Sequence, residues 1–201
     1  MAISKLLIAN RGEIAARVIR TAHALGLATV AVYSDPDAGA PYVTLADQAV
    51  RLPGAAPADT YLRGEAIIAA AAHTAADAVH PGYGFLSENA AFARACAEAG
   101  LIFVGPAPDT ITAMGDKVAA KALMAAAGVP VLPSRAVTED ATAAAAEVGF
   151  PLLVKAAFGG GGRGMRLVTD PARLEEAVES ARREAAAAFG DGTVFLERYV
   201  P

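Results

Sequence analysis

A glycine run between two strand-like segments is the part of the sequence best suited to chemistry. Residues 150–155 and 163–168 are short and mostly apolar, and four glycines, 159–162, lie between them. This order is typical of a β-hairpin whose tip has no side chains. Glycine allows several backbone N–H groups to face one anion, so such a tip could enclose a phosphate. Lys155, at the end of the entering strand, would place an ammonium group beside that phosphate.

The same residues also allow a plainer interpretation. Most short glycine runs are flexible surface turns, and Lys155 would then be a solvated charge at a sheet edge. The common phosphate-loop patterns are absent, because no Gly-Lys-Ser or Gly-Lys-Thr follows the run and the glycines do not open a helix after a strand. The residues of the hairpin alone leave both interpretations open.

The composition limits the classes of function. The 201 residues carry 17 Lys and Arg against 21 Asp and Glu, so no broad basic field is available for nucleic acid. Cys96 is the single cysteine, which excludes an internal disulfide framework and a thiolate metal cluster. The three histidines lack metal-ligand spacing, and we predict no metal site. With neither a signal pattern nor an apolar run of membrane length, the sequence predicts a cytoplasmic protein without membrane contact.

Strand-like and helix-like segments alternate through the first half of the chain. The apolar run 5–9 is followed by 13–25, where apolar residues recur at helical spacing. This spacing predicts right-handed parallel units, and therefore an open parallel sheet with helices on both faces. The predicted strands are 5–9, 28–33, 49–52, 76–79 and 101–104, and the predicted helices are 13–25, 61–73 and 89–99.

A dinucleotide site is disfavoured in this sheet. The first strand-to-helix turn, residues 10–13, contains only Gly12 in place of the usual glycine fingerprint. Asp35 ends the second strand, where a ribose-binding acid would lie, but it precedes Pro36 and we interpret it as a turn residue. An NAD-dependent oxidoreductase is therefore a weak hypothesis.

The loop 80–89 follows a predicted strand, so it lies at the carboxyl edge of the sheet, where open α/β sheets build their sites. In one interpretation it lines a cleft and Glu88 makes a polar contact with a substrate. In the other, which we prefer, Ser87 caps the next helix, Glu88 favours the positive end of that helix, and the apolar residues fill a domain interface.

The alternation stops at 105–108, and we predict a domain boundary near Ala113, which gives domains 1–113 and 114–201. The second domain is expected to be a small α+β unit with a mainly antiparallel sheet. Its predicted elements are a helix 116–127, a short strand from 131, a helix 139–148, the hairpin, a helix 171–189 and a strand 193–199. The fold class is thus α/β, a Rossmann-like parallel-sheet domain followed by a smaller α+β subdomain.

Four stretches resemble the biotin carboxylases, the ATP-grasp subunits or domains of acetyl-, propionyl-, pyruvate- and related biotin-dependent carboxylases. They are 8–15, 80–89, 114–117 and 155–166, and they occur in the order typical of that family. The resemblance covers the whole chain. It implies the N-terminal portion of such a protein, as in the alpha subunit of acetyl- and propionyl-CoA carboxylases, with a Rossmann-like domain that binds no dinucleotide.

The resemblance also implies which residues bind ATP. These are Lys117, Lys155, Gly161, Gly162, Glu197, Arg198, Tyr199 and Val200. The lysines would neutralise phosphates, the glycines would close over them, and the last four residues would border the adenine. Without the resemblance, Lys117 would be interpreted as a solvated helix charge and 194–200 as an ordinary edge strand. Phe158 stands where many members have another glycine, which would stiffen the lid.

The implied reaction has two steps. ATP and bicarbonate give carboxyphosphate, and the carboxyl group then passes to a ureido nitrogen of biotin on a carrier domain. The implied cofactors are ATP with Mg²⁺ or Mn²⁺, with metal ligands outside this chain, and biotin as the acceptor. The implied partners are the biotin carboxyl carrier domain and a carboxyltransferase subunit, and a homodimer is compatible with the family.

The part of the family's ATP-grasp domain that supplies the metal-binding acids, the bicarbonate- and biotin-binding arginines and the general base is not in this sequence. We therefore assign no catalytic residue, and we expect the 201-residue chain alone to be inactive. The alternative hypothesis is a stand-alone nucleotide-binding or interaction module without carboxylase activity. The final acyl acceptor cannot be inferred from these residues.

Overall fold

A computed structural model describes residues 2–138, 140–158 and 165–201. The chain forms two compact units, Met1–Thr112 and Ala113–Pro201. Among the described helices, none combines the length and the apolar character that a membrane span needs.

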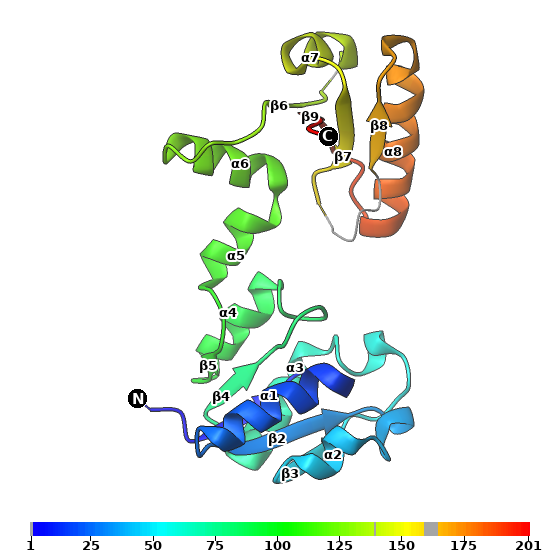
Figure 1. The fold of residues 1–201 in the computed structure, drawn as a ribbon. Coiled ribbons are helices and arrows are strands. Elements are labelled where there is room, and N and C mark those ends of the chain that lie inside the picture. Colours follow the sequence, from blue (N-terminus) through cyan, green and yellow to red (C-terminus); the bar gives the residue numbers. More distant parts are fainter. Residues whose placement is uncertain (1, 139, 159–164) are drawn as a thin grey trace. The chain divides into compact units, whose positions relative to one another are not determined.

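The first unit contains a five-stranded parallel sheet with the strand order β3-β2-β1-β4-β5 (Figure 1). The strands are β1 (Lys5–Ile8), β2 (Ala28–Tyr33), β3 (Gln48–Arg51), β4 (Ala78–His80) and β5 (Ile102–Phe103). The helices are α1 (Gly12–Ala24), α2 (Pro41–Leu45), α3 (Gly64–Thr74), α4 (Ala90–Glu98) and α5 (Pro108–Gly115), and the last of these contains the boundary between the units. Two 3₁₀ turns, η1 (Asp35–Asp37) and η2 (Pro57–Asp59), complete the unit.

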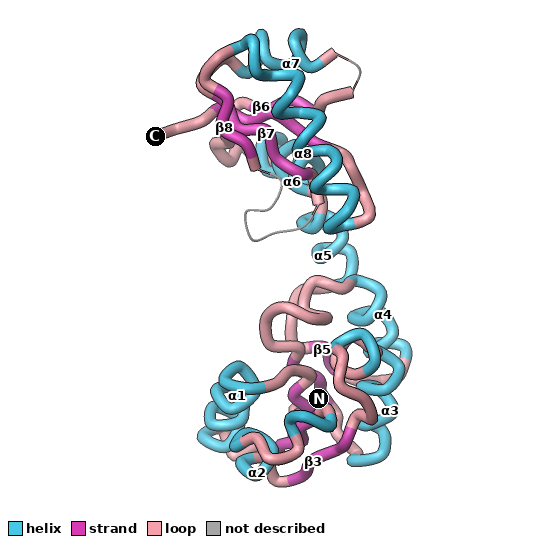
Figure 2. Tube along the Cα trace, turned by 90° about the vertical axis from the view of Figure 1, so that its right-hand side faces the viewer, coloured by secondary structure: helices cyan, strands magenta, loops and turns pink. Residues whose placement is uncertain are grey.

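Helices cover both faces of this sheet, as the alternation of segments predicts. In Figure 2, α1 and α2 lie on one side of the strands and α3 and α4 on the other. Side chains that alternate along the strands form two hydrophobic cores, one on each face of the sheet. Leu6 and Ile8 pack with Ile19 of α1, whereas Leu7 and Val79 pack with Ile67 of α3. Burial of both faces explains why the central strands β1 and β2 are mostly apolar.

A buried carboxylate joins the turns at the carboxyl edge of this sheet. Asp37, in η1, accepts hydrogen bonds from Arg11 Nε at 2.6 Å and from Tyr61 Oη at 2.5 Å. Tyr42 Oη lies 3.0 Å from Tyr61 Oη, and both tyrosines are fully buried. The carboxylate therefore ties the turn after β1 to α2 and to the segment before α3.

We predict that Asp37→Asn lowers the free energy of unfolding of the first unit by about 2 kcal/mol at neutral pH. The hydrogen bond from Arg11, opposed by burial and assisted by Tyr61, lowers the pKa of Asp37 from 3.8 to about 2. Because the folded pKa is the lower one, the contribution is complete above about pH 4 and is lost as the pH falls toward about 2.

Urea unfolding at a series of pH values measures this difference. Asp35→Asn is the matched control, because Asp35 pairs with Arg51 at the surface, where solvent screens the pair. Equal losses in the two variants, or a loss for Asp37→Asn that does not depend on pH, would contradict the prediction.

The second unit is built on an antiparallel sheet with the strand order β6-β9-β7-β8. Its strands are β6 (Ser134–Ala136), β7 (Leu152–Ala156), β8 (Arg166–Val168) and β9 (Val194–Arg198). Its helices are α6 (Lys117–Ala126), α7 (Ala141–Val148) and α8 (Leu174–Phe189), with a 3₁₀ turn, η3 (Pro171–Arg173), before α8. The pairing of β7 with β8 confirms the predicted hairpin, whose residues 159–164 lie outside the described part of the chain.

One face of the second sheet carries its core. Leu152, Val154 and Leu196 pack against α7 and α8, and the three are fully buried. Since β7 and β9 each pair with a strand on both sides, neither is an edge strand. The interpretations of Lys155 as an edge charge and of 194–200 as an edge strand are therefore wrong.

Two local predictions in the first unit need correction. Asn89, not Ser87, caps α4, because its side chain accepts a hydrogen bond from Phe92 N at 2.9 Å. The helix predicted to begin at residue 61 begins at Gly64, because η2 and the buried Tyr61 occupy the preceding segment. Asp35 does lie in a turn, where it accepts hydrogen bonds from Gly54 N and Arg51 Nε, as predicted.

Candidate functional site

The strand register places several predicted site residues on the sheet face opposite the core of the second unit. Leu153 of β7 lies directly opposite Leu167 of β8 and Glu197 of β9. Lys155 lies opposite Phe195 in the same way. Directly opposed residues share a face, and side chains alternate along a strand. These five residues therefore share one face, and the buried apolar residues between them point to α7 and α8.

Helix α6 adds two lysines to this region. Asp116 caps the helix, and its carboxylate accepts hydrogen bonds from Val118 N at 2.8 Å and Ala119 N at 3.2 Å. Lys117 follows at once, and its backbone N and its Nζ both donate to Ala157 O, at 3.2 and 3.4 Å. Lys121 lies four residues later and so occupies the same side of α6. The cap therefore fixes both lysines beside the end of β7.

The carboxylate of Glu197 lies between two ammonium groups. Lys155 Nζ is 2.6 Å from Oε2, and Lys121 Nζ pairs with Oε1. The side chains are shielded from water, with exposed fractions of 10% for Glu197, 19% for Lys121 and 23% for Lys155. Burial alone would raise the pKa of Glu197, but the hydrogen bonds from the two lysines outweigh it and lower that pKa. The carboxylate is therefore charged at neutral pH.

This arrangement suits a ligand with an anionic end and a flat apolar end. The cluster of Lys121, Lys155 and Glu197 has a net charge of plus one. Lys117 adds a further positive charge nearby. Leu153 and the exposed Leu167 continue the same face with apolar surface. Ammonium groups bind phosphate, and an aliphatic surface packs against an aromatic ring, so a nucleotide is a good chemical match.

The predicted site residues do not all lie together. Lys155 and Glu197 are in direct contact, and Lys117 contacts Ala157, two residues beyond Lys155. Arg198 lies on the opposite face, where its Nη1 donates to Val148 O.

The remaining predicted residues lie at or beyond the ends of the strands. Tyr199 N donates to Pro151 O at 3.1 Å, and Val200 is exposed. Gly161 and Gly162 lie outside the described residues. Lys121 is not among the predicted site residues, although its spacing of four residues from Lys117 is a signal that places it on the same side of the helix.

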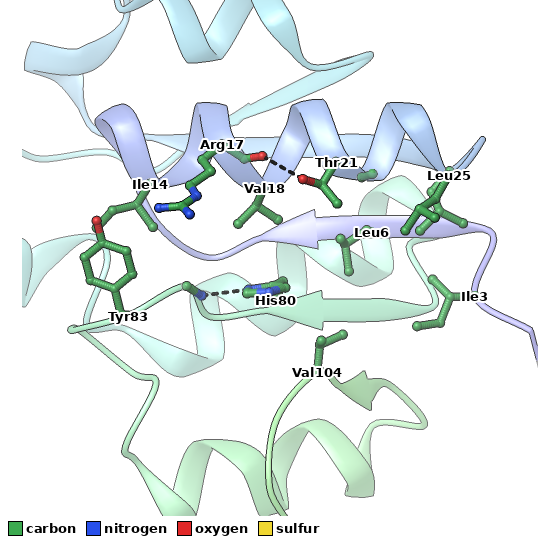
Figure 3. A pocket seen from close by; sticks show the side chains of 13 residues that line it. Ile3, Leu6, Ile14, Arg17, Val18, Thr21, Leu25, His80, Tyr83 and Val104 are labelled. Atoms are coloured by element: carbon green, nitrogen blue, oxygen red, sulfur yellow. Dashed lines mark hydrogen bonds between the residues drawn. The ribbon is translucent and has the colours of Figure 1, made fainter.

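The first unit has an apolar cavity of about 440 Å³ beneath α1, which holds none of the predicted nucleotide-binding residues (Figure 3). Val18 of α1 and Leu25, the C-cap of that helix, face Leu6 and Val104 across it. His80 at its wall accepts a hydrogen bond from Gly82 N through Nδ1, and burial lowers the pKa of this histidine. Its polar groups include the His80 imidazole, the Thr21 hydroxyl and the Arg17 guanidinium, but most of its lining is apolar.

Asn10 fixes the loop after β4 at the carboxyl edge of the first sheet. Its Nδ2 donates to Pro81 O at 2.7 Å and to Tyr83 O at 3.0 Å. Tyr83 Oη in turn lies 3.3 Å from Glu13. The buried side-chain amide of Asn10 therefore anchors the loop. Glu88, in the same loop, is exposed. Within the described residues, no group of three His, Cys, Asp or Glu side chains could hold a metal ion.

Comparison with known proteins identifies the family. Residues 2–111 match the family described as the biotin carboxylase N-terminal domain. The chain belongs to the biotin carboxylase family. Residues 116–201 match the ATP-binding domain of the carbamoyl-phosphate synthase L chain, which coincides with the unit that carries the lysine cluster.

Relatives of known sequence and structure agree with this membership. The mitochondrial methylcrotonoyl-CoA carboxylase subunit alpha of Oryza sativa subsp. japonica is 52% identical over 99% of this chain. The biotin-dependent acyl-coenzyme A carboxylase alpha3 subunit of Mycobacterium leprae is 50% identical over 98%. The biotin carboxylase of Campylobacter jejuni, solved as a β,γ-ATP complex, is 47% identical to this chain, with a TM-score of 0.94. The match covers 100% of this chain and 46% of the Campylobacter chain.

The biotin carboxylases and carboxylase subunits compared are longer than this chain. The chain spans 28% of the Oryza protein, 34% of the Mycobacterium protein and 44% of the biotin carboxylase of Halalkalibacterium halodurans. A further solved structure is the biotin carboxylase domain dimer of the 2-oxoglutarate carboxylase from Hydrogenobacter thermophilus, in complex with MgADP and bicarbonate. It is 46% identical to this chain, with a TM-score of 0.93, and the match covers 100% of this chain and 45% of that domain chain.

Proposed function

We propose that this chain supplies the N-terminal domain, 1–113, and the first part of the ATP-binding domain, 114–201, of a biotin carboxylase. The whole protein would use ATP and bicarbonate to carboxylate biotin on a carrier domain. The observation that carries the proposal is the cluster of Lys121, Lys155 and Glu197, which offers a net positive, partly shielded site in the unit that matches an ATP-binding domain.

In this proposal each predicted residue contacts a particular part of ATP. Lys117 and Lys155 neutralise the phosphates of ATP, while Glu197 and the main chain from Arg198 to Val200 border the adenine. Gly161 and Gly162 close over the phosphates. Mg²⁺ would shield the charge of the transferred phosphoryl group when bound. The proposal assigns the metal no ligand in this chain, because the family resemblance implies that the metal-binding acids lie outside these residues.

The partners follow from the same chemistry. A biotin carboxyl carrier domain would deliver the acceptor, and a carboxyltransferase subunit would take the carboxyl group onward; a second copy of the chain is a further proposed partner. The compartment we propose is the cytoplasm. The final acyl acceptor stays open, since relatives include methylcrotonoyl-CoA and broader acyl-CoA carboxylases.

Calorimetric titration of the chain with Mg-ATP tests the nucleotide site. We predict that Lys155→Ala weakens binding by at least about tenfold, because it removes a charge-assisted contact to phosphate. Arg135→Ala is the matched control: this cation pairs with Glu147 and belongs to the other face of the same sheet. NAD should not compete. Equal affinities of wild type and Lys155→Ala, or no binding by wild type, would overturn the proposed site.

ATP binding alone does not distinguish a carboxylase from a nucleotide-binding module without carboxylase activity. ATP turnover by the whole protein that depends on bicarbonate and biotin would support the first. Nucleotide binding without such turnover would favour the second.

A further inference from the structure

The contacts of Glu197 give Lys121 a role that its sequence context does not suggest. Lys121 lies in an alanine-rich helix, yet its ammonium group pairs with Glu197 Oε1 and only 19% of its side chain is exposed. Lys155 takes the other oxygen of the same carboxylate, Oε2, at 2.6 Å. The two lysines come from different elements, α6 and β7, and meet on one residue of β9.

Charge counting shows what Lys121 adds. The pair of Lys155 and Glu197 alone is neutral, because the carboxylate offsets the ammonium charge. With Lys121 present, the carboxylate has two counter-charges and the cluster keeps a net charge of plus one. In a site shielded from water, this difference acts on a nearby anion with little screening.

We propose that Lys121 is a positioning residue of the nucleotide site, which holds Glu197 and offsets its charge so that Lys155 remains an effective cation for phosphate. This inference rests on the proposed function. Lys121 needs no contact with the nucleotide, because it acts through Glu197. The consequence falls mainly on the anionic part of the ligand. Losing Lys121 weakens binding of the phosphates, whereas Lys155 still pairs with Glu197 at the adenine, so binding of the nucleoside changes little.

The test compares Mg-ATP with adenosine by calorimetric titration. Lys121→Met should weaken Mg-ATP by at least about tenfold and change adenosine by less than about twofold. Lys121→Arg, which keeps the charge, should retain most of the Mg-ATP affinity. The double variant Lys121→Met with Glu197→Gln should recover the ratio of Mg-ATP to adenosine affinity, because both charges of that pair are gone. Arg135→Ala should leave both affinities unchanged.

A second measurement follows Glu197 without nucleotide. Carbon-13 NMR of its carboxylate should show a higher pKa in Lys121→Met, because burial is then opposed by Lys155 alone. Within the part of the chain that the structure describes, the charged side chains recorded against this carboxylate are Lys121 from α6 and Lys155 from β7. Ser134 of β6 and Leu153 of β7 lie directly opposite Glu197 in the sheet.

Each outcome decides something. Equal losses for Mg-ATP and adenosine would show that Lys121 only maintains the fold, and an unchanged ratio would show that its charge does not reach the phosphates; either overturns the inference while the proposed function stands. No binding of Mg-ATP by wild type overturns the proposed site and the inference together.

Discussion

The Glu197→Ala variant is expected to lose about 3 kcal/mol of the free energy of unfolding of the second unit. The substitution removes the only carboxylate recorded between Lys121 and Lys155 in the described structure, and it leaves two shielded ammonium groups close together. Both side chains must then turn toward water or lose their charges. Urea unfolding, followed by circular dichroism, measures the loss.

The pH dependence of this contribution has a definite sign. The pKa of Glu197 is below its ordinary value of 4.5 in the folded chain, so its contribution is present above that value and is lost as the pH falls through the folded pKa. The wild-type second unit should therefore weaken in acid, and Glu197→Ala should lack that part of the dependence. A variant that unfolds at the wild-type urea concentration at every pH would contradict the prediction.

An apolar replacement of the whole cluster separates stability from function. Combining Lys121→Met, Lys155→Met and Glu197→Leu removes all three charges, and well-packed apolar residues often replace a buried ion pair without loss of stability. The triple variant should therefore regain most of the stability that Glu197→Ala loses, and yet fail to bind Mg-ATP.

The order of secondary structure could be predicted because each long element carries its own local signal. The buried strands β1 and β2 are mostly apolar, and α1 and α8 repeat apolar residues at helical spacing. Alternation of these segments then predicts the parallel sheet. The five-residue α2 had no such signal, because one turn is too short to show periodicity.

The contacts of the candidate site were less accessible to sequence analysis. Lys121 and Glu197 are 76 residues apart, and only the register of β7 with β9 and the placement of α6 bring them together. The same is true of the buried contact between Asp37 and Tyr61, which are 24 residues apart. A lysine on an alanine-rich helix is most simply interpreted as solvated, so only the three-dimensional structure reveals that Lys121 is largely buried. Lys117 entered the prediction through family resemblance alone.

The second large effect is expected at Gly82, which lies in the loop after β4. Gly82→Ala should lower the free energy of unfolding of the first unit by about 3 kcal/mol. The glycine has φ +68°, and an added Cβ would lie 2.7 Å from Asn10 Nδ2 and 2.7 Å from Ile14 Cγ2. Asn10 is fully buried and donates to two carbonyls of this loop, so it cannot move without losing those bonds.

Gly84→Ala is the matched control for this substitution. Gly84 has a similar φ of +72°, but nothing lies within 4 Å of an added Cβ. Both variants therefore carry the same kind of backbone strain, about 1 kcal/mol, and only Gly82→Ala displaces Asn10. The difference between the two urea unfolding curves gives the cost of the close contacts with Asn10 and Ile14. Equal losses would mean that Asn10 and Ile14 adapt at no cost, and that backbone conformation alone requires glycine at both positions.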